Sequence, residues 1–324
     1  MIVITGGAGF IGSALLWRLN TLGMSELVVV DHLGNSEKWR NLVKRSYADY
    51  MDRDKFIDLV RRNALPWPVA GIVHLGACSS TTETDAGFLM ENNFHYSRDL
   101  CSWALENDVR FINASSAATY GAGENGFSDD PRLLPKLRPL NIYGYSKHLF
   151  DLWLARENLL DSVASLKFFN VYGPNEYHKG AMKSVAAKLH KEIGETGRAT
   201  LFASSAPEIA DGEQKRDFVY VKDAVELIAW LLLDRPDVNG IRNVGSGRAR
   251  SFNDVARAMF ATLGREENIR YVPIPENIAV NYQNFTRADM GWLAEANYPQ
   301  KFRTLEEGIE DYSREHLSGA DPWL

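Results

Sequence analysis

The sequence predicts an α/β protein with a Rossmann-like, doubly wound parallel sheet and a smaller C-terminal α/β substrate-binding lobe. Three observations lead to this fold class. Strand-like and helix-like segments alternate from the first residues, as in a parallel sheet covered by helices on both faces. A glycine-rich turn joins the first predicted strand to the first predicted helix, where such folds hold a dinucleotide. From about Val171 onward the loops lengthen, and glycine and proline become more frequent.

The first half of the chain contains five short apolar segments that we interpret as buried strands. These strands are residues 2–5, 27–31, 71–75, 110–114 and 165–169. Between them, apolar residues recur with the helical period. The predicted helices are residues 9–22, 50–62, 85–106 and 140–158.

We therefore interpret residues 1–170 as a dinucleotide-binding Rossmann domain and residues 171–324 as a smaller substrate-binding lobe. The lobe has helix-like segments at 181–195 and 251–263, and a partly acidic loop, predicted to be flexible, at 204–215. Strand-like segments at 217–221 and 240–244 suggest that elements around 217–250 return to the first domain.

Composition narrows the function classes. The chain of 324 residues has 45% hydrophobic residues, 24% charged residues and a formal net charge of −6, which argues against general binding to nucleic acid or a membrane surface. No apolar run approaches the roughly 20 residues needed to span a bilayer. Two cysteines, Cys78 and Cys101, are too few for a disulfide framework and fit a reducing compartment. The first residues lead straight into the glycine-rich turn without a signal peptide, so we expect a cytoplasmic protein. We also expect no metal site.

The segment from Thr5 to Gly12 reads Thr-Gly-Gly-Ala-Gly-Phe-Ile-Gly and supplies Gly6, Gly9 and Gly12 at fingerprint spacing. Such glycines permit a tight turn and close backbone approach, and the following helix N-terminus favours a pyrophosphate. Asp31 ends the second predicted strand, where a carboxylate normally binds ribose hydroxyls and favours NAD. Three nearby cations can instead neutralise a 2′-phosphate and favour NADP. They are His32, Lys38 and Arg53.

Tyr143 and Lys147 are four residues apart and therefore lie on one face of a helix. A free tyrosine titrates near pH 10, about three units too high for a base at neutral pH, and a neighbouring ammonium favours the phenolate. Ser116 follows the fourth predicted strand, at the edge of the sheet where α/β proteins bind ligands. The combination predicts a general base assisted by a serine hydroxyl that polarises a substrate oxygen as hydride leaves its carbon.

Two further segments allow alternative interpretations. In Gly76-Ala-Cys-Ser-Ser-Thr-Thr-Glu83, small residues suit the nicotinamide side of a dinucleotide, and Cys78 is interpreted as a packed residue rather than a nucleophile. Taken alone, Lys179 is either a second acid/base group or a surface lysine. Arg216 precedes a buried strand and suits either a diphosphate or an ion pair with Asp217.

Together these residues resemble the extended short-chain dehydrogenase/reductase family, and within it the enzymes that epimerise C6 of ADP-heptoses. The likeness spans nearly the whole chain, but the segment from Cys78 to Thr82 and His178-Lys-Gly180 are the specific matches. The other matching segments are Ala114 to Gly121, Tyr143 to Lys147, Phe169 to Pro174, Arg216 to Tyr220, Tyr282 to Thr286, and Glu307-Gly308.

The resemblance implies that bound NADP, or NAD, takes hydride from the heptose C6 and returns it to the opposite face of a transient C6 aldehyde, in the synthesis of a lipopolysaccharide core precursor. Tyr143 and Lys179 are then the two bases, Ser116 orients the C6 oxygen, and Lys147 holds the nicotinamide ribose and lowers the tyrosine pKa. A homo-oligomer, typically a pentamer, is also implied.

Carried over to this sequence, the resemblance also implies sets of ligand contacts. With the glycines of the turn included, the expected cofactor contacts are Gly6, Gly9, Phe10, Ile11, Gly12, Asp31, His32, Lys38, Arg53, Leu75, Gly76, Ala77, Cys78, Ser79, Asn92, Lys147 and Lys179. The substrate contacts are Ser79, Ser116, Asn170, Ala181, Lys188, Phe202, Ala203, Ser204, Ser205, Arg216 and Tyr282. The chain departs from the family pattern at Ala181, Lys188 and Arg53, where serine, histidine and lysine are usual.

Other functions compete with this interpretation. A 4,6-dehydratase usually places Asp-Glu beside the catalytic hydroxyl, whereas Ser116 is followed by two alanines. An NAD-dependent nucleotide-sugar 4-epimerase shares the same chemistry, and Lys179 is the main residue that separates the two. A non-catalytic NADP-binding protein often lacks part of the active set, but Ser116, Tyr143 and Lys147 are all present here.

Overall fold

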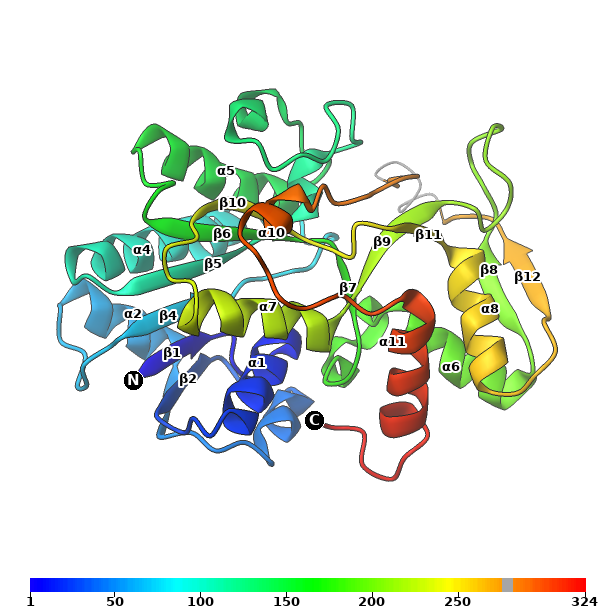
Figure 1. Cartoon of the computed structure of the whole chain (residues 1–324), viewed down its shortest axis with the longest axis horizontal. Helices are drawn as coiled ribbons and strands as arrows, with labels where there is room; N and C mark the ends of the chain where they lie inside the picture. The colour runs from blue at the N-terminus through cyan, green and yellow to red at the C-terminus, as the bar shows by residue number, and fades with distance from the viewer. Residues whose placement is uncertain (276–281) are drawn as a thin grey trace.

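The computed structural model describes residues 1–275 and 282–324. A seven-stranded parallel sheet, in the order β10-β6-β5-β4-β1-β2-β3, dominates the molecule and confirms the predicted fold class (Figure 1). Its strands are β1 (Ile2–Thr5), β2 (Leu27–Asp31), β3 (Asp49–Asp52), β4 (Gly71–His74), β5 (Arg110–Ser116), β6 (Val163–Phe168) and β10 (Gly240–Val244).

Helices cover both faces of this sheet because alternate strand residues point to opposite sides. Ile4 and Val29 join a core with α1 and α7, whereas Val3 and Val28 join a separate core with α2, α4 and α5. These helices are α1 (Phe10–Thr21), α2 (Arg53–Arg61), α4 (Tyr96–Glu106), α5 (Ile142–Arg156) and α7 (Val221–Leu233).

The C-terminal part of the chain has its own apolar core around α6, α8 and α11, seen on the right of Figure 1. A three-stranded sheet, β11-β9-β7, and a two-stranded sheet, β12-β8, support it. Its elements are β7 (Asn170–Tyr172), α6 (Val185–Thr196), β8 (Ala199–Phe202), β9 (Lys215–Tyr220), β11 (Ala249–Ser251), α8 (Phe252–Thr262), β12 (Ile269–Val272) and α11 (Leu305–Asp311). The short helix α10 (Gly291–Glu295) instead packs with the large sheet, because Trp292 joins the core of α1 and α7 and donates a hydrogen bond to the carbonyl oxygen of Asn243 in β10.

The chain passes between these two parts more than once. The strand expected at 240–244 is β10, which pairs in parallel with β6 in the large sheet. The strand expected at 217–221 is β9, and it pairs instead with β7 and β11. Between them, α7 packs against α1, so a late helix covers the first strands.

Three predicted helices differ from the structure. The segment 50–62 begins as β3, because its backbone pairs with β2, and α2 starts only after Asp52, whose side chain accepts a hydrogen bond from the Asp54 amide. The segment 85–106 is divided into α3 (Ala86–Leu89), the π-helical turn η2 (Met90–His95) and α4. The helix expected at 181–195 begins at Val185, because Ser184 caps it.

Short 3₁₀ and π-helical turns complete the described elements. They are η1 (Glu37–Leu42), η3 (Ala117–Tyr120), η4 (Pro131–Lys136), η5 (Tyr177–Met182) and η6 (Tyr312–Leu317).

Candidate active site

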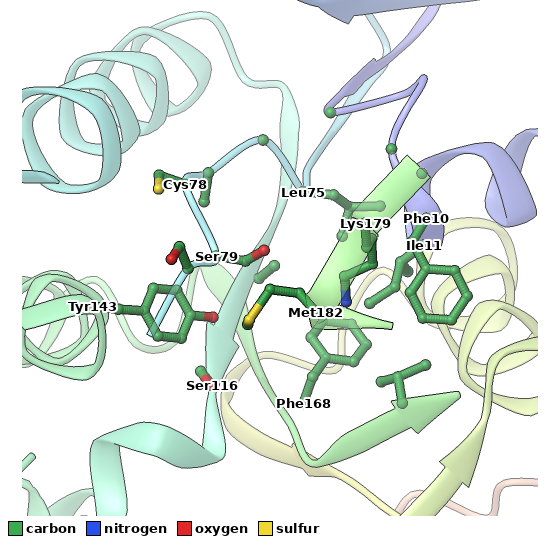
Figure 2. A pocket seen from close by; sticks show the side chains of 18 of the residues that line it. Phe10, Ile11, Leu75, Cys78, Ser79, Ser116, Tyr143, Phe168, Lys179 and Met182 are labelled. Carbon is green, nitrogen blue, oxygen red and sulfur yellow. The ribbon is translucent and has the colours of Figure 1, made fainter. Parts of the chain in front are cut away.

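A cavity of about 790 Å³ lies at the carboxyl edge of the large sheet, between the two parts of the chain. Open α/β sheets bind ligands at this edge. Tyr143, Ser116, Lys147 and Lys179 all line it. Figure 2 shows Tyr143 and Lys179 reaching into the pocket from opposite sides, with the side chain of Met182 between them in this view.

One wall of the cavity is built by α5 and the end of β5. Asn141 caps α5 by accepting a hydrogen bond from the Gly144 amide at 2.8 Å, which fixes the first turn and Tyr143 with it. Ser116 is the last residue of β5. The hydroxyl groups of Tyr143 and Ser116 both face the pocket (Figure 2). The predicted helical face of Tyr143 and Lys147 is therefore present and turned toward the cavity.

The electrostatics of Tyr143 differ from the prediction. Burial raises the pKa of Tyr143, and the hydrogen bond with Ser116 opposes this rise. We expected Lys147 to lower the tyrosine pKa, and this is wrong for the structure as it stands, because desolvation is the larger effect. Ser116, rather than Lys147, is the neighbour that favours the phenolate here.

Lys147 is buried, and its Nζ has no hydrogen-bond partner among the described residues. Burial lowers the pKa of Lys147 to about 8, while the charge of Asp151 raises it. A buried ammonium without an acceptor is costly, so this atom is suited to bind an acceptor supplied by a ligand. Ribose hydroxyls fit that requirement.

The opposite wall is built by η5, which carries Lys179. The ammonium lies 5.3 Å from the centre of the Phe10 ring, close enough for a cation–π contact. Burial lowers the pKa of Lys179, Glu176 raises it and Lys188 lowers it further. The next residue, Gly180, has φ 53° and ψ −123°, so the backbone turns sharply immediately after the lysine.

Buried carboxylate and amide groups hold this second wall in place. Glu176 is fully buried and accepts hydrogen bonds from the amide and hydroxyl of Ser184, at 2.5 and 2.6 Å, and from the Tyr312 hydroxyl. Asn175 donates to the Ser13 hydroxyl of α1 at 3.0 Å. The segment with Lys179 is thereby tied to α1.

At the far end of the cavity, the glycine turn fits a pyrophosphate. Gly9 caps α1 without a side-chain hydrogen bond, which leaves the first amides of the helix available for an anion. A Cβ atom on Gly12 would lie 2.2 Å from the carbonyl oxygen of Gly6, so only glycine lets the helix start this close to the turn.

The ribose end of the cavity combines an acid with cations. The Asp31 carboxylate accepts from the Ala8 amide at 2.9 Å and pairs with Lys38 at 2.8 Å. Arg53 contacts Asn92 and Asp54, and both Lys38 and Arg53 line the cavity. Because Lys38 neutralises Asp31, this end does not present an unpaired carboxylate that would repel a 2′-phosphate.

The cavity contains every residue predicted to contact the cofactor, from Gly6 to Lys179. The predicted substrate residues are divided. Ser79, Ser116 and Asn170 line the cavity, while the remaining predicted substrate contacts do not. The residues outside it are Ala181, Lys188, Phe202, Ala203, Ser204, Ser205, Arg216 and Tyr282.

Arg216 nevertheless lies beside the cavity, because it contacts the ring of Phe252, and Phe252 lines the cavity. Its guanidinium is 5.7 Å from the Phe252 ring and 5.0 Å from the Tyr282 ring, and Tyr282 meets Phe202 edge to face. Arg216 is buried, and burial lowers its pKa.

Arg216 makes no ion pair with a carboxylate among the described residues, so the expected alternative of a pair with Asp217 is wrong. Asp217 accepts its bonds from Ser246, Gly247 and Ala288 instead.

Sequence reasoning missed several residues of the cavity, among them Met182, Lys183 and His178. Met182 is 39% exposed, although it is apolar and faces the pocket. Its sequence signal was weak, because Met182 lies inside the helix predicted at 181–195, where an apolar residue is expected to pack on the helix face.

Within the described ranges, 1–275 and 282–324, no group of three or more His, Cys, Asp or Glu side chains is placed to hold a metal ion. No helix there combines the length and apolarity needed to cross a lipid bilayer.

Known proteins are similar to this chain over its full length. The family model described as NAD dependent epimerase/dehydratase family matches residues 2–245. The ADP-L-glycero-D-manno-heptose-6-epimerase of Nitratidesulfovibrio vulgaris is 57% identical over 324 residues, with 100% of both chains covered. That of Fusobacterium nucleatum is 43% identical over 334 residues, again with 100% of both covered. The crystal structure of the Helicobacter pylori ADP-L-glycero-D-manno-heptose-6-epimerase is 27% identical, with a TM-score of 0.77, covering 96% of this chain and 94% of that one.

Proposed function

The chain belongs to the NAD dependent epimerase/dehydratase family, as its motifs predicted, and we propose that it converts ADP-D-glycero-D-manno-heptose to ADP-L-glycero-D-manno-heptose. It is an isomerase that inverts C6 of the heptose. Full-length relatives of 57% and 43% identity carry this activity in their names. The observation that supports it most directly is the pair of proton-transfer groups, Tyr143 and Lys179, on opposite walls of one cavity.

Inversion at an unactivated carbon needs a temporary oxidation, because a C–H bond next to a hydroxyl is not acidic enough to lose a proton. A nicotinamide bound in this cavity supplies a hydride acceptor that later serves as the donor. C6 of a heptose is bonded to both C5 and C7, so its oxidation gives a ketone. The C6 aldehyde expected from the sequence is therefore wrong on chemical grounds.

The protein groups divide the proton transfers between the two walls. Tyr143 takes the proton of the C6 hydroxyl on one side, and Ser116 holds that oxygen. After the ketone has turned over, Lys179 donates a proton to the oxygen on the other side. The reverse reaction exchanges the roles of the two residues. Lys147 binds the nicotinamide ribose through its unpaired ammonium.

For the cofactor we propose NADP. Lys38 pairs with Asp31 and thereby removes the main repulsion toward a 2′-phosphate, and Arg53 adds a second cation at the same end of the cavity. The buried Arg216, without a carboxylate partner among the described residues and flanked by aromatic rings, is proposed to bind the diphosphate of the substrate. A cytoplasmic homo-oligomer, a pentamer by family resemblance, that makes a lipopolysaccharide core precursor completes the proposal.

The reaction is tested by incubating the purified protein, without added cofactor, with ADP-D-glycero-D-manno-heptose in D₂O. NMR at C6 should show the L-epimer with ordinary hydrogen at C6, because the hydride never exchanges with water. Deuterium at C6 would contradict the redox route. Conversion of UDP-glucose to UDP-galactose, without conversion of the heptose, would instead support a 4-epimerase.

The cofactor is tested by denaturing the protein and identifying the released dinucleotide. Replacing both Lys38 and Arg53 by Ala should weaken NADP binding by about 10²- to 10⁴-fold, since each charge-assisted contact contributes about 1.5–3 kcal/mol. NAD binding should change much less. The matched control is Arg61→Ala. Arg61 lies on the same helix as Arg53, and its exposed side chain pairs with Asp99. Equal losses for NAD and NADP would show that these side chains do not bind the 2′-phosphate.

A further inference from the structure

Asp151 is a buried carboxylate on the cavity-facing side of α5. It follows Lys147 by four residues and Tyr143 by eight, so the three side chains share one face of the helix. Asp151 is fully buried. Its oxygens accept hydrogen bonds from the hydroxyls of Ser115 at 2.7 Å and Ser165 at 2.8 Å.

A second buried lysine connects Asp151 to the serine of the active site. Lys167, from β6, is 1% exposed and pairs with Asp151 at 2.6 Å. Its ammonium also donates to the Thr119 hydroxyl at 2.6 Å, and that hydroxyl donates to the carbonyl oxygen of Ser116 at 2.8 Å. Ser115, bonded directly to Asp151, precedes Ser116 in β5. One carboxylate is therefore connected on two sides to the strand end that carries the substrate-orienting hydroxyl.

The same carboxylate acts on Lys147 through space. Burial lowers the pKa of Lys147 to about 8, and the negative charge of Asp151 opposes this shift. His74 on β4 and His148 on α5 also lie near these lysines. Burial lowers their pKa values to about 3 and about 4, so both rings are uncharged at neutral pH. Burial also raises the pKa of Tyr143, which faces the same pocket. The charge that acts on Lys147 is thus that of Asp151.

We propose that Asp151 is a positioning residue of the active site that pairs with Lys167, fixes the end of β5 beneath Ser116 and places a negative charge one helical turn from the unpartnered ammonium of Lys147. The proposal rests on the proposed function, which assigns Lys147 to the nicotinamide ribose and Ser116 to the C6 oxygen. The competing explanation is that Asp151 serves only to neutralise Lys167, because a buried ammonium without a partner is strongly destabilising.

Two variants separate these explanations. Asp151→Asn keeps the shape and one acceptor oxygen but removes the charge. Asp151→Asn combined with Lys167→Met removes both members of the ion pair, so neither charge is left buried alone. For each variant, NADP affinity and kcat are measured as a function of pH, together with the free energy of unfolding in urea. Glu157→Gln, an exposed carboxylate at the end of the same helix with a side chain that is 46% exposed, is the control.

If Asp151 keeps Lys147 charged, Asp151→Asn should move the alkaline loss of both NADP affinity and kcat about one pH unit or more toward lower pH. At a pH above the pKa of Lys147, lowering that pKa by one unit reduces NADP affinity or kcat about tenfold. The double variant should recover the stability of the parent protein yet retain the shifted pH profile. Glu157→Gln should leave the profile unchanged.

Recovery of the parent pH profile in the double variant would overturn the proposal, because it would show that Asp151 only neutralises Lys167. An unshifted profile in Asp151→Asn would overturn it as well. Because NADP affinity can be measured without epimerisation, the test of Asp151 and the test of the proposed function can fail separately. A parent protein that binds NADP but does not epimerise the heptose would refute that function, while the pH dependence of binding would still test the role of Asp151.

Discussion

The two walls of the cavity hold their proposed proton-transfer groups in different ways. Tyr143 stands on a helix of 15 residues, capped by Asn141 and backed by the buried hydroxyl and charge network around Asp151. Lys179 stands on the six-residue turn η5, where the buried Glu176 and the turn at Gly180 set its position. One proposed base is therefore held by regular secondary structure, whereas the other depends on a few side-chain hydrogen bonds. We expect the second wall to be the more sensitive to small changes.

The largest effects should come from the two bases themselves. Tyr143→Phe and Lys179→Ala should each reduce C6 inversion by about 10²- to 10⁴-fold, the range typical of general acid–base residues. Dinucleotide should still co-purify with both variants. Inversion is followed by NMR of the heptose. Full activity in Lys179→Ala would contradict the two-base assignment, because it would leave the second wall without a chemical role.

An intermediate effect is expected from Glu176→Gln, which removes the charge that supports Lys179. Glu176 raises the pKa of Lys179, so its loss lowers that pKa further and leaves less lysine protonated as the pH rises. Activity should fall about tenfold near neutral pH, and its alkaline limb should move to lower pH. Kinetics across pH measures this change. Glu195→Gln, an exposed carboxylate of α6 whose side chain is 62% exposed, is the control and should behave like the parent.

The smallest effect is expected from Ser184→Ala, which removes the cap of α6 and one hydrogen bond to Glu176. Loss of a cap costs about 1 kcal/mol of unfolding free energy. Asn141→Ala removes the corresponding cap of α5 at a similar cost. Urea unfolding and steady-state kinetics on both variants measure how much each wall depends on its cap. We expect similar stability losses but a larger fall in kcat for Ser184→Ala, since α5 has the Asp151 network as a second support. A larger fall for Asn141→Ala would reverse the order of sensitivity.

The sequence predicted the features that depend on local pattern. The parallel sheet, the glycine turn and the shared face of Tyr143 and Lys147 all follow from periodicity and spacing of nearby residues, and the structure contains them. The division of residues 85–106 by a π-helical turn, and β3 inside an expected helix, could not be predicted in this way. Both depend on pairing and packing with elements far away in the chain.

The electrostatics of the site were also beyond local reasoning. The pKa of Tyr143 follows from burial and from Ser116, which the chain brings to the tyrosine only after folding. The link from Asp151 through Lys167 to Ser116 joins α5, β6 and β5, so no single motif contains it. Met182 shows the same limit, because its exposure beside Lys179 depends on where α6 begins.

The backbone at Gly180 has a practical consequence for anyone who randomises this loop to change substrate preference. A Cβ atom there would meet no other atom within 4 Å, so crowding does not forbid a larger residue. The torsion angles forbid a larger residue, because φ 53° with ψ −123° lies outside the regions open to L-amino acids, including the left-handed region that asparagine tolerates. A saturation library at this codon should therefore return glycine alone among the active clones, although a structure-based design that checks only for clashes would accept alanine.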